Sequence, residues 1–464
     1  MSEQTSLWTL DQVLAATGGQ GTVPFAATGV QFDSRQVMPG DLFLAMPGAR
    51  DGHEFVADAM KKGAVAAIVS EGQGHGPEVL VEDVPRALEA LGVAARRRAQ
   101  TRIAVTGSVG KTTVTQILLA ALGHAGSAHG PVKSFNNHIG VPLTLARTPH
   151  DTQAAVYELG MNAPGEIAPL SKWVAPQVAL ITKVAAVHIE AFEDITGIAR
   201  EKASIAEGLQ PGGMLCTPAG TPFETIFQQA AERAGAKRLT FGPDGDAECL
   251  SCRVDGQRQH LSVRVGGETV EVTLQTLGAH WAENAAGILL TVQAAGIDLG
   301  HGVAALEAYR PPLGRGGREG VQIKGGTLEL IDDSYNANPT SVRAALSVLA
   351  AASGRKVAIL TDMLELGDHA VAAHRDLAEA VKAAGVELLI VVGTLMKGLA
   401  DQVGNSLSVI WASTPEDATA TVHDALRPGD VVLVKGSNAS GAARLAEGVR
   451  ALSIQNSVTE LERR

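Results

Sequence analysis

Several features that would place a 464-residue chain in a special class of protein are scarce or missing. Three cysteines are too few for a disulfide framework, and no apolar stretch approaches the ~20 residues that span a bilayer. The N-terminus lacks the basic lead and apolar core of a signal peptide. A formal net charge of −11, with no basic block of interleaved aromatics, disfavours nucleic-acid binding. We therefore expect a cytoplasmic protein with no membrane insertion and no nucleic-acid partner.

Two of the cysteines, Cys249 and Cys252, form a C-x-x-C pair in a β-rich segment. A redox or zinc role would suit the spacing, but no second pair follows at metal-site spacing. Two ordinary thiols are therefore the favoured interpretation, and the role of the pair stays open.

The most informative stretch is RIAVTGSVGKTTVTQ, residues 102–116. Its apolar run, glycine turn and apolar helical pattern predict a strand, a phosphate-binding loop and a helix. The usual G-x-x-x-x-G-K-[ST] spacing is not met, because Val105 stands where the first glycine would be. In the shorter T-G-x-x-G-K-T form, Lys111 suits the outer phosphates of a nucleotide and Thr112 suits Mg²⁺. The alternative is a glycine-rich turn with a solvated lysine.

Two polar residues follow strand-like segments of the same region. Glu158 ends the strand-like AAVYE, and His188 follows VALIT. Taken singly, each has an ordinary explanation as a surface acid or a core histidine. Beside a phosphate loop, a carboxylate at a strand end is a typical Mg²⁺ ligand, so we interpret both as metal ligands. Lys202, in a predicted helix over 195–209, shows no feature of its own.

The flanking regions differ in pattern. Asp33-Ser34-Arg35 lies in a loop-like context near the start, and such a triplet suits a phosphate or diphosphate but arises often by chance. After the linker-like RPPLGRGG at 310–317, strands and helices alternate, including a predicted helix over 371–384 and another over 442–451. This alternation predicts a mostly parallel sheet with polar residues at its ligand-binding edge.

Several motifs together resemble the Mur ligase family. They are TGSVGKTT, ELGMNAPGEI, HIEAF, the G-x-H-x-x-x-N of 278–284, DDSYNANP and LVKGS, and they follow the order of the family. The resemblance implies an α/β protein with a small UDP-substrate-binding domain at 1–99, a central P-loop ATPase-type domain at 100–310 and a Rossmann-like domain at 311–464.

The resemblance also implies roles for matching positions. ATP would be held by the loop Gly107, Ser108, Val109, Gly110, Lys111, Thr112 and Thr113, with Asn284 at the adenine and Arg315 and Asp333 near phosphates and ribose. Mg²⁺ would be held by Thr112, Glu158, His188 and Lys202, the last as a carbamate. Ser34, Arg35, Asn137, Tyr335 and Asn338 would contact the other substrates.

The D-S-R…P-G-D-L-F segment and DDSYNANP resemble one branch of the family in particular. That resemblance implies an ATP-dependent amide ligase of peptidoglycan synthesis, which joins D-alanyl-D-alanine to UDP-N-acetylmuramoyl-tripeptide through an acyl phosphate. We expect a monomer. Whether the third residue of the tripeptide is diaminopimelate or lysine is open. The alternatives are a folylpolyglutamate synthase or another Mur ligase and, from other classes, a P-loop kinase or a nucleotide-switched binding module.

Three positions depart from the pattern of the family. Lys183 stands where asparagine is frequent, Thr361 precedes Asp362 where glycine is common, and Asn438 occupies a position where arginine is often found. The last two bear on dipeptide and nucleotide contacts in the last domain, not on the reaction type.

Overall fold

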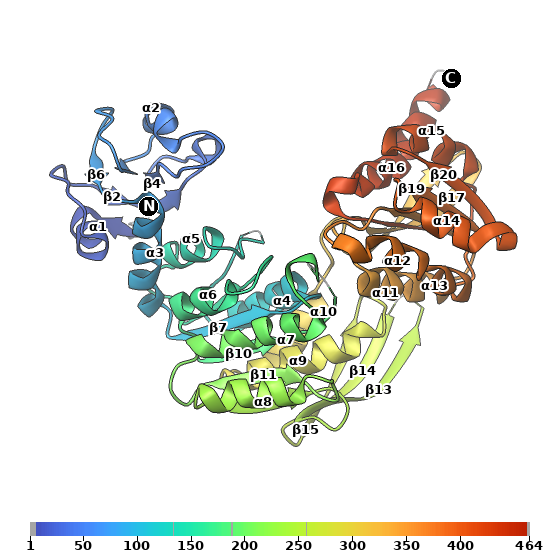
Figure 1. Ribbon diagram of the computed structural model, residues 1–464, viewed down its shortest axis with the longest axis horizontal. Coiled ribbons are helices and arrows are strands. Elements are labelled where there is room, and N and C mark those ends of the chain that lie inside the picture. Colours follow the sequence, from blue (N-terminus) through green and yellow to red (C-terminus); the bar gives the residue numbers. More distant parts are fainter. Residues whose placement is uncertain (1–5, 133, 187–188, 257, 462–464) are drawn as a thin grey trace.

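The computed structural model describes residues 6–132, 134–186, 189–256 and 258–461. Three large sheets follow one another along the chain, with a two-stranded sheet near the start. The N-terminal and C-terminal units lie at opposite ends of the central unit, as Figure 1 shows. The α/β fold with three successive units is confirmed, whereas the boundaries at 99/100 and 310/311 stay predictions.

The N-terminal unit has a four-stranded parallel sheet in the order β3-β4-β5-β6 and the antiparallel pair β1–β2. Helix α1 begins with a capping box at Thr9 and ends at the left-handed Gly18, while Asp83 caps α3. Its strands are β1 (Trp8–Thr9), β2 (Ala26–Ala27), β3 (Gly29–Gln31), β4 (Asp41–Leu44), β5 (Ala66–Val69) and β6 (Glu78–Leu80), and its helices are α1 (Leu10–Thr17), α2 (Val56–Lys61) and α3 (Val84–Ala95).

The central unit is a nine-stranded sheet in the order β15-β14-β13-β12-β11-β10-β7-β9-β8. Its strands are β7 (Thr101–Thr106), β8 (Ala128–His129), β9 (Ala154–Glu158), β10 (Val178–Ile181), β11 (Met214–Pro218), β12 (Lys237–Phe241), β13 (Ala247–Asp255), β14 (Arg258–Val265) and β15 (Glu268–Leu274). Its helices are α4 (Lys111–Ala125), α5 (Gly140–Ala146), α6 (Ile167–Val174), α7 (Ile195–Ala203), α8 (Glu224–Arg233), α9 (His280–Ala294) and α10 (Leu299–Ala308).

Both faces of the parallel part of this sheet are covered. Ile103 and Val105 of β7 pack into one core with α4, α9 and α10, and Ala104 packs into the other with α6, α7 and α8. This two-sided burial explains why β7 reads as a continuous apolar run. Strands β13 to β15 extend the sheet as an antiparallel meander.

The C-terminal unit is a six-stranded sheet in the order β16-β17-β21-β18-β19-β20, parallel except for the edge pair β16–β17. The predicted mostly parallel sheet is confirmed. Its strands are β16 (Gly317–Ile323), β17 (Gly326–Asp333), β18 (Arg355–Thr361), β19 (Leu388–Val392), β20 (Ser408–Ala412) and β21 (Asp430–Lys435), and its helices are α11 (Pro339–Ala350), α12 (Ala370–Arg375), α13 (Ala378–Ala383), α14 (Lys397–Val403), α15 (Pro415–Ala425) and α16 (Ala442–Leu461).

Two helix predictions in this unit were wrong in extent. The single helix expected over 371–384 is two helices, because a turn at 376–377 directs the fully buried Leu377 into the core. The last helix runs on to Leu461, ten residues beyond the predicted end. None of the helices in the described ranges is long and apolar enough to cross a membrane.

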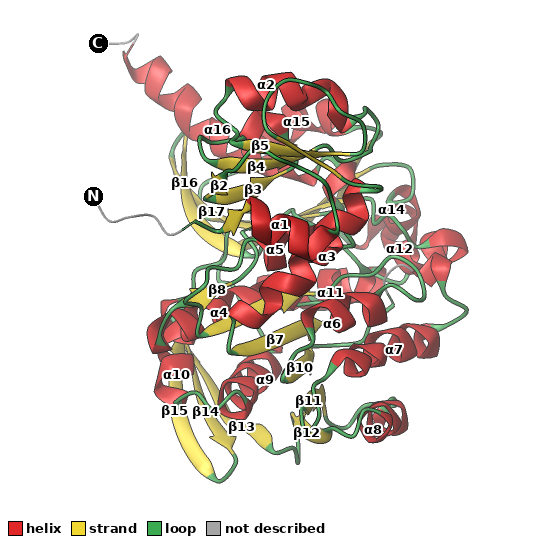
Figure 2. Cartoon of the chain, turned by 90° about the vertical axis from the view of Figure 1, so that its left-hand side faces the viewer, coloured by secondary structure: helices red, strands yellow, loops and turns green. Residues whose placement is uncertain are grey.

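Helix α5 joins the N-terminal unit to the central one. Figure 2 shows α3 and α5 close together between the N-terminal sheet and β7. The indole N–H of Trp8 donates to the Ala146 carbonyl at 2.8 Å, and Arg147 Nε donates to the Val30 carbonyl at 2.7 Å. Since α5 follows the loop beside the phosphate site, the N-terminal unit is anchored to a segment close to that site.

Candidate functional site

The phosphate loop has the geometry expected from its sequence. Strand β7 ends at Thr106, the loop turns through Gly107 and Gly110 with φ of +153° and +87°, and α4 begins at Lys111. A side chain at Gly107 would collide with the Thr182 hydroxyl. The Thr182 hydroxyl donates to the Val109 carbonyl at 2.7 Å, and Ser108 N donates to the Lys183 carbonyl at 2.6 Å. The glycines therefore allow the loop to pack against the segment after β10.

Lys111 lies inside the pocket above this loop. Its Nζ donates to the Gly107 carbonyl at 2.8 Å. Burial lowers the pKa of Lys111, Glu158 opposes that shift, and the positive Arg315 adds to it. An anionic ligand would favour the ammonium form of Lys111, so phosphate oxygens suit this position.

Glu158 ends β9 with a carboxylate that is incompletely satisfied. The residue is 2% exposed, and its Oε1 accepts a hydrogen bond from Asn136 Nδ2 at 2.8 Å. Its Oε2 is buried and finds no hydrogen-bond partner among residues 6–132, 134–186, 189–256 and 258–461. A buried carboxylate oxygen normally has a partner, so this one fits a site completed by a bound cation.

A row of polar groups connects the loop helix to the C-terminal unit. The Thr112 and Ser134 hydroxyls are 3.3 Å apart, and Arg315 Nη2 donates to Ser134 Oγ at 3.5 Å. The Arg315 guanidinium also lies over the Tyr335 ring, 3.9 Å from its centroid. Arg315 therefore spans the boundary between a central-unit hydroxyl and a C-terminal-unit ring.

Lys202 lies on α7 and is 1% exposed. Burial lowers its pKa well below the ordinary value, the charge of Lys111 lowers it further, and Glu201 partly opposes both. Glu201 itself accepts backbone hydrogen bonds from Gly165 and Ile167, each at 2.8 Å. The Lys202 amine is thus held toward its neutral form, in which it is a nucleophile.

Helix α9 supplies the wall beside Gly110. Asn284 lies beside that glycine, whose Cβ, if present, would be 3.5 Å from Asn284 Oδ1. Its neighbour Glu283 pairs with Lys183 at 3.0 Å. Lys183, which stands where asparagine is frequent in the family, is therefore paired with the helix that carries Asn284.

The C-terminal unit closes the pocket with the ends of β17 and β21. Lys435, 2% exposed, pairs with Asp333 at 2.7 Å and donates to the Asn336 carbonyl at 2.8 Å. Burial raises the pKa of Asp333 above its usual value, and Lys435 opposes that shift. Asn338 caps α11, because its side-chain Oδ1 accepts a hydrogen bond from Ser341 N at 2.9 Å. That oxygen is therefore already engaged by the start of the helix.

One pocket of about 500 Å³ brings most of the predicted residues together. Of the predicted residues, those that line it are Ser108, Val109, Gly110, Lys111, Thr112, Thr113, Asn137, Glu158, Asn284, Arg315, Asp333, Tyr335 and Asn338. Gly107 and Lys202 do not line it, and His188 lies outside the described residues. Contributions from both the central and C-terminal units make the pocket an interdomain site.

Ser34 and Arg35 do not line this pocket. They form a short 3₁₀ helix (Ser34–Gln36) in the N-terminal unit, where Asp33 accepts from Arg35 Nε and Nη2 at 2.9 Å each. Hydrogen bonds from Arg35 hold the pKa of Asp33 well below its usual range. The Arg35 guanidinium remains largely exposed on that unit.

Sequence reasoning missed Asn136 and Ser134 as site residues. Both lie in the loop before α5, which the sequence marks only by its run of polar and amide side chains. Asn136 orients Glu158, and its side chain would collide with any residue larger than glycine at 160. Only the fold shows that this loop passes the end of β9.

Among the described residues, no three His, Cys, Asp or Glu side chains gather into a metal cluster. Mg²⁺ is commonly bound by one or two carboxylates together with water and phosphate oxygens. Glu158 and the Thr112 hydroxyl satisfy that modest requirement, and a bound nucleotide would supply the remaining oxygens.

Three family models match consecutive parts of the chain. "Mur ligase family, catalytic domain" matches residues 26–99, "Mur ligase middle domain" residues 105–292, and "Mur ligase, glutamate ligase domain" residues 319–438.

Individual relatives match nearly the whole chain. The UDP-N-acetylmuramoyl-tripeptide–D-alanyl-D-alanine ligase of Escherichia coli K12 is 32% identical, covering 91% of this chain and 93% of its own. The crystal structure of MurF from Acinetobacter baumannii superposes with a TM-score of 0.87 at 30% identity, covering 96% and 98%. MurF from Thermotoga maritima in complex with ADP gives 0.77 at 25%, covering 92% and 98%.

Proposed function

Because this chain belongs to the Mur ligase family of ATP-dependent amide-forming ligases, we propose that it joins D-alanyl-D-alanine to UDP-N-acetylmuramoyl-tripeptide. The observation that carries the proposal is the match along about nine-tenths of both chains to relatives named for that reaction. Such coverage includes all three units, whereas the phosphate loop alone would suit many nucleotide-binding proteins.

The proposed chemistry makes a poor acylating agent reactive. The terminal carboxylate of the tripeptide attacks the γ-phosphorus of ATP, which releases ADP and forms an acyl phosphate. The amine of D-alanyl-D-alanine then attacks the acyl carbon, phosphate leaves, and the amine loses a proton to give the amide. The pocket assists by holding anionic and nucleophilic groups in line.

The residues that line the pocket have separate parts in this proposal. Lys111 exchanges its bond to the Gly107 carbonyl for the β- and γ-phosphates, and the backbone N–H groups of 107–113 hold the remaining oxygens. Asn284 contacts the adenine, while Arg315 and Asp333 contact the phosphates and ribose. Tyr335 and Asn338 lie near the incoming dipeptide, and Asn137 near the muramoyl peptide.

Mg²⁺ suits the Thr112 hydroxyl and the Glu158 carboxylate of this pocket. Thr112 and Glu158 would hold one ion, and His188 with a carbamylated Lys202 a second. When bound, the ions neutralise phosphate charge that would otherwise repel the incoming carboxylate. The Glu158 oxygen, which has no hydrogen-bond partner in the described part of the chain, is the feature that supports the assignment.

The carbamate on Lys202 has its own physical support. A neutral amine attacks the carbon of CO₂ and then loses a proton, which leaves a carboxylate-like group on the lysine. Burial and the neighbouring Lys111 both favour that neutral amine. Carbamylation would also place a negative charge near the positive Lys111.

Ser34 and Arg35 are proposed to hold the UDP moiety, which divides the substrates among residues 1–99, 100–310 and 311–464. The largely exposed Arg35 guanidinium is available for a diphosphate. The proposed product is a peptidoglycan precursor made in the cytoplasm, so we expect the enzyme to act in that compartment. We also expect it to be a monomer.

A phosphate-release assay tests the proposal. The complete mixture holds ATP, Mg²⁺, D-alanyl-D-alanine and UDP-N-acetylmuramoyl-tripeptide, with diaminopimelate and lysine forms of the tripeptide in separate arms. We expect phosphate release to require both the UDP-tripeptide and D-alanyl-D-alanine. Release with ATP alone, or with a glutamate donor and a folate acceptor, would contradict it.

A further inference from the structure

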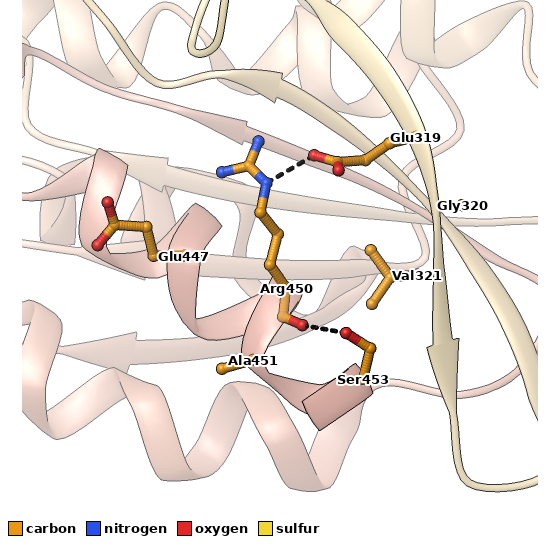
Figure 3. Close-up of a pocket in the computed structure, with 7 residues that line it drawn as sticks. All are labelled: Glu319, Gly320, Val321, Glu447, Arg450, Ala451 and Ser453. Atoms are coloured by element: carbon orange, nitrogen blue, oxygen red, sulfur yellow. Dashed lines mark hydrogen bonds and ion pairs between the residues drawn. The ribbon is translucent and has the colours of Figure 1, made fainter. Parts of the chain in front are cut away.

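Arg450 lies on α16 and is not among the residues that line the nucleotide pocket. It borders a separate cavity of about 380 Å³ between α16 and β16, which Figure 3 shows. Its Nε donates to Glu319 Oε1 at 2.6 Å, and its Nη2 donates to Asp332 Oδ2 at 2.5 Å. The guanidinium therefore has an outer partner on β16 and an inner partner on β17.

The inner partner, Asp332, is a buried carboxylate, 3% exposed, that receives several donors. Besides Arg450, Gly314 N donates to its Oδ2 at 3.1 Å. Ser334 donates to its Oδ1 twice, from the backbone N at 3.1 Å and from the hydroxyl at 2.6 Å. Arg450 supplies the one formal positive charge among these donors.

The groups that Asp332 holds adjoin the residues that line the nucleotide pocket. Gly314 precedes Arg315, and Ser334 lies between Asp333 and Tyr335. Tyr335 N donates to the Gly314 carbonyl at 2.9 Å, and Gly316 N donates to the Asp332 carbonyl at 2.7 Å. Residues 314–316 and 332–335 are thus joined to each other around one carboxylate.

We propose that Arg450 is a positioning residue of the nucleotide site, which acts through Asp332 to hold Arg315, Asp333 and Tyr335 in their places. A buried carboxylate without its cation either takes up a proton or moves toward water, and both changes loosen the bonds from Gly314 and Ser334. The inference rests on the proposed function, because it assumes that Arg315 and Asp333 contact the nucleotide.

Arg450→Met tests the inference, since it removes the charge and retains an apolar stem. Glu319→Gln is the matched control, because it weakens only the ion pair between Arg450 and its outer, more exposed partner and leaves the bond to Asp332 in place. We expect Arg450→Met to raise the KM for ATP and the Kd for ADP about tenfold, the scale of one charged hydrogen bond. The KM for UDP-tripeptide should stay within about twofold, and Arg450→Lys should recover most of the ATP affinity.

The outcomes separate a positioning role from simple stabilisation. Equal ADP affinity in Arg450→Met and the wild type, or an equal loss in Glu319→Gln, would overturn the inference. So would parallel losses for both substrates, which would indicate general unfolding. If the wild-type enzyme binds ADP but releases no phosphate with its proposed acceptors, the proposed function fails while the ADP comparison still decides the role of Arg450.

Discussion

At the scale of single residues, two charged groups in or near the pocket are buried without full compensation from the described residues. Glu158 has an oxygen for which the described part of the chain offers no hydrogen-bond partner, and Lys202 is buried near enough to Lys111 for that charge to lower its pKa. Burying such groups costs free energy, so we expect a ligand or a modification to compensate each of them. That reasoning leads to two residue-level predictions.

Lys202→Ala should abolish turnover, because the variant cannot form the carbamate. Acetate or formate at high concentration should restore part of the activity by replacing the lost carboxylate. Lys172→Ala is the control, since Lys172 forms an exposed pair with Glu207 and should not affect turnover. Full activity of Lys202→Ala without an additive would contradict the carbamate role.

Glu158→Gln should lower kcat by about 10²-fold, the usual cost of losing a group that controls transition-state charge, and should raise the Mg²⁺ concentration needed for half-maximal rate. The glutamine keeps an oxygen for Asn136, so folding should be preserved. A Mg²⁺ titration of the phosphate-release rate measures both effects, with the exposed Glu207→Gln as control. An unchanged Mg²⁺ requirement would remove Glu158 from the metal site.

At the scale of elements, interior histidine and arginine side chains connect neighbouring segments. Arg102 is 8% exposed and donates to the carbonyls of Val174, Ala175 and Ala99. On α12, His374 is fully buried, accepts from Met363 N at 2.9 Å through Nε2, and donates through Nδ1 to the Ala370 carbonyl at 2.6 Å. These two bonds require a neutral ring.

The bond from Met363 should weaken in acid. Burial lowers the pKa of His374 in the folded state, while hydrogen bonding to Ala370 and the charge of Asp362 oppose the shift. Below about pH 6.5 the unfolded state therefore binds the proton more readily than the folded state. The free energy of unfolding consequently decreases as the pH is lowered, by at most about 1.4 kcal/mol per pH unit. Amide hydrogen exchange of Met363 between pH 8 and 5 measures the opening free energy.

His374→Gln should be less stable at pH 8 and should lose this pH dependence. The control is His369→Gln, because His369 is exposed and should not alter the profile. An opening free energy for Met363 that does not change with pH in the wild type would show that His374 does not titrate in this range.

At the scale of the whole molecule, the proposed substrate sites are distributed over all three units. Ser34 and Arg35 belong to the N-terminal unit, while the pocket lies between the other two. Figure 1 shows the outer units at opposite ends of the central one. A tripeptide held at its UDP end must nevertheless bring its carboxylate to the γ-phosphate.

We therefore expect the units to close around the substrates. Small-angle scattering should show a smaller radius of gyration with a non-hydrolysable ATP analogue and UDP-tripeptide than with neither. Either ligand alone is the control and should give a smaller change. An unchanged radius with both bound at saturation would exclude closure.

Much of the fold was determined by local sequence pattern. The apolar run of β7, the glycine turn and the helix pattern predicted the phosphate loop, and regular alternation predicted the parallel C-terminal sheet. Such patterns can be recognised in the sequence because burial of one or both faces of an element imposes a regular spacing of apolar residues. The family followed from motifs that are each contiguous in the chain.

Tertiary structure alone decided which distant residues meet. No local pattern distinguishes Lys202, which only the family resemblance singled out and whose pKa is lowered by burial and by the charge of Lys111. The same holds for Arg450, which contacts Asp332 across 118 positions and which no motif includes. Asn136 likewise acquires its role only because its loop passes the end of β9. Burial, charge neighbours and hydrogen-bond partners depend on how sheets and helices pack. The sequence by itself therefore determined the phosphate loop and the family, while the packing of distant elements decided which side chains complete the pocket.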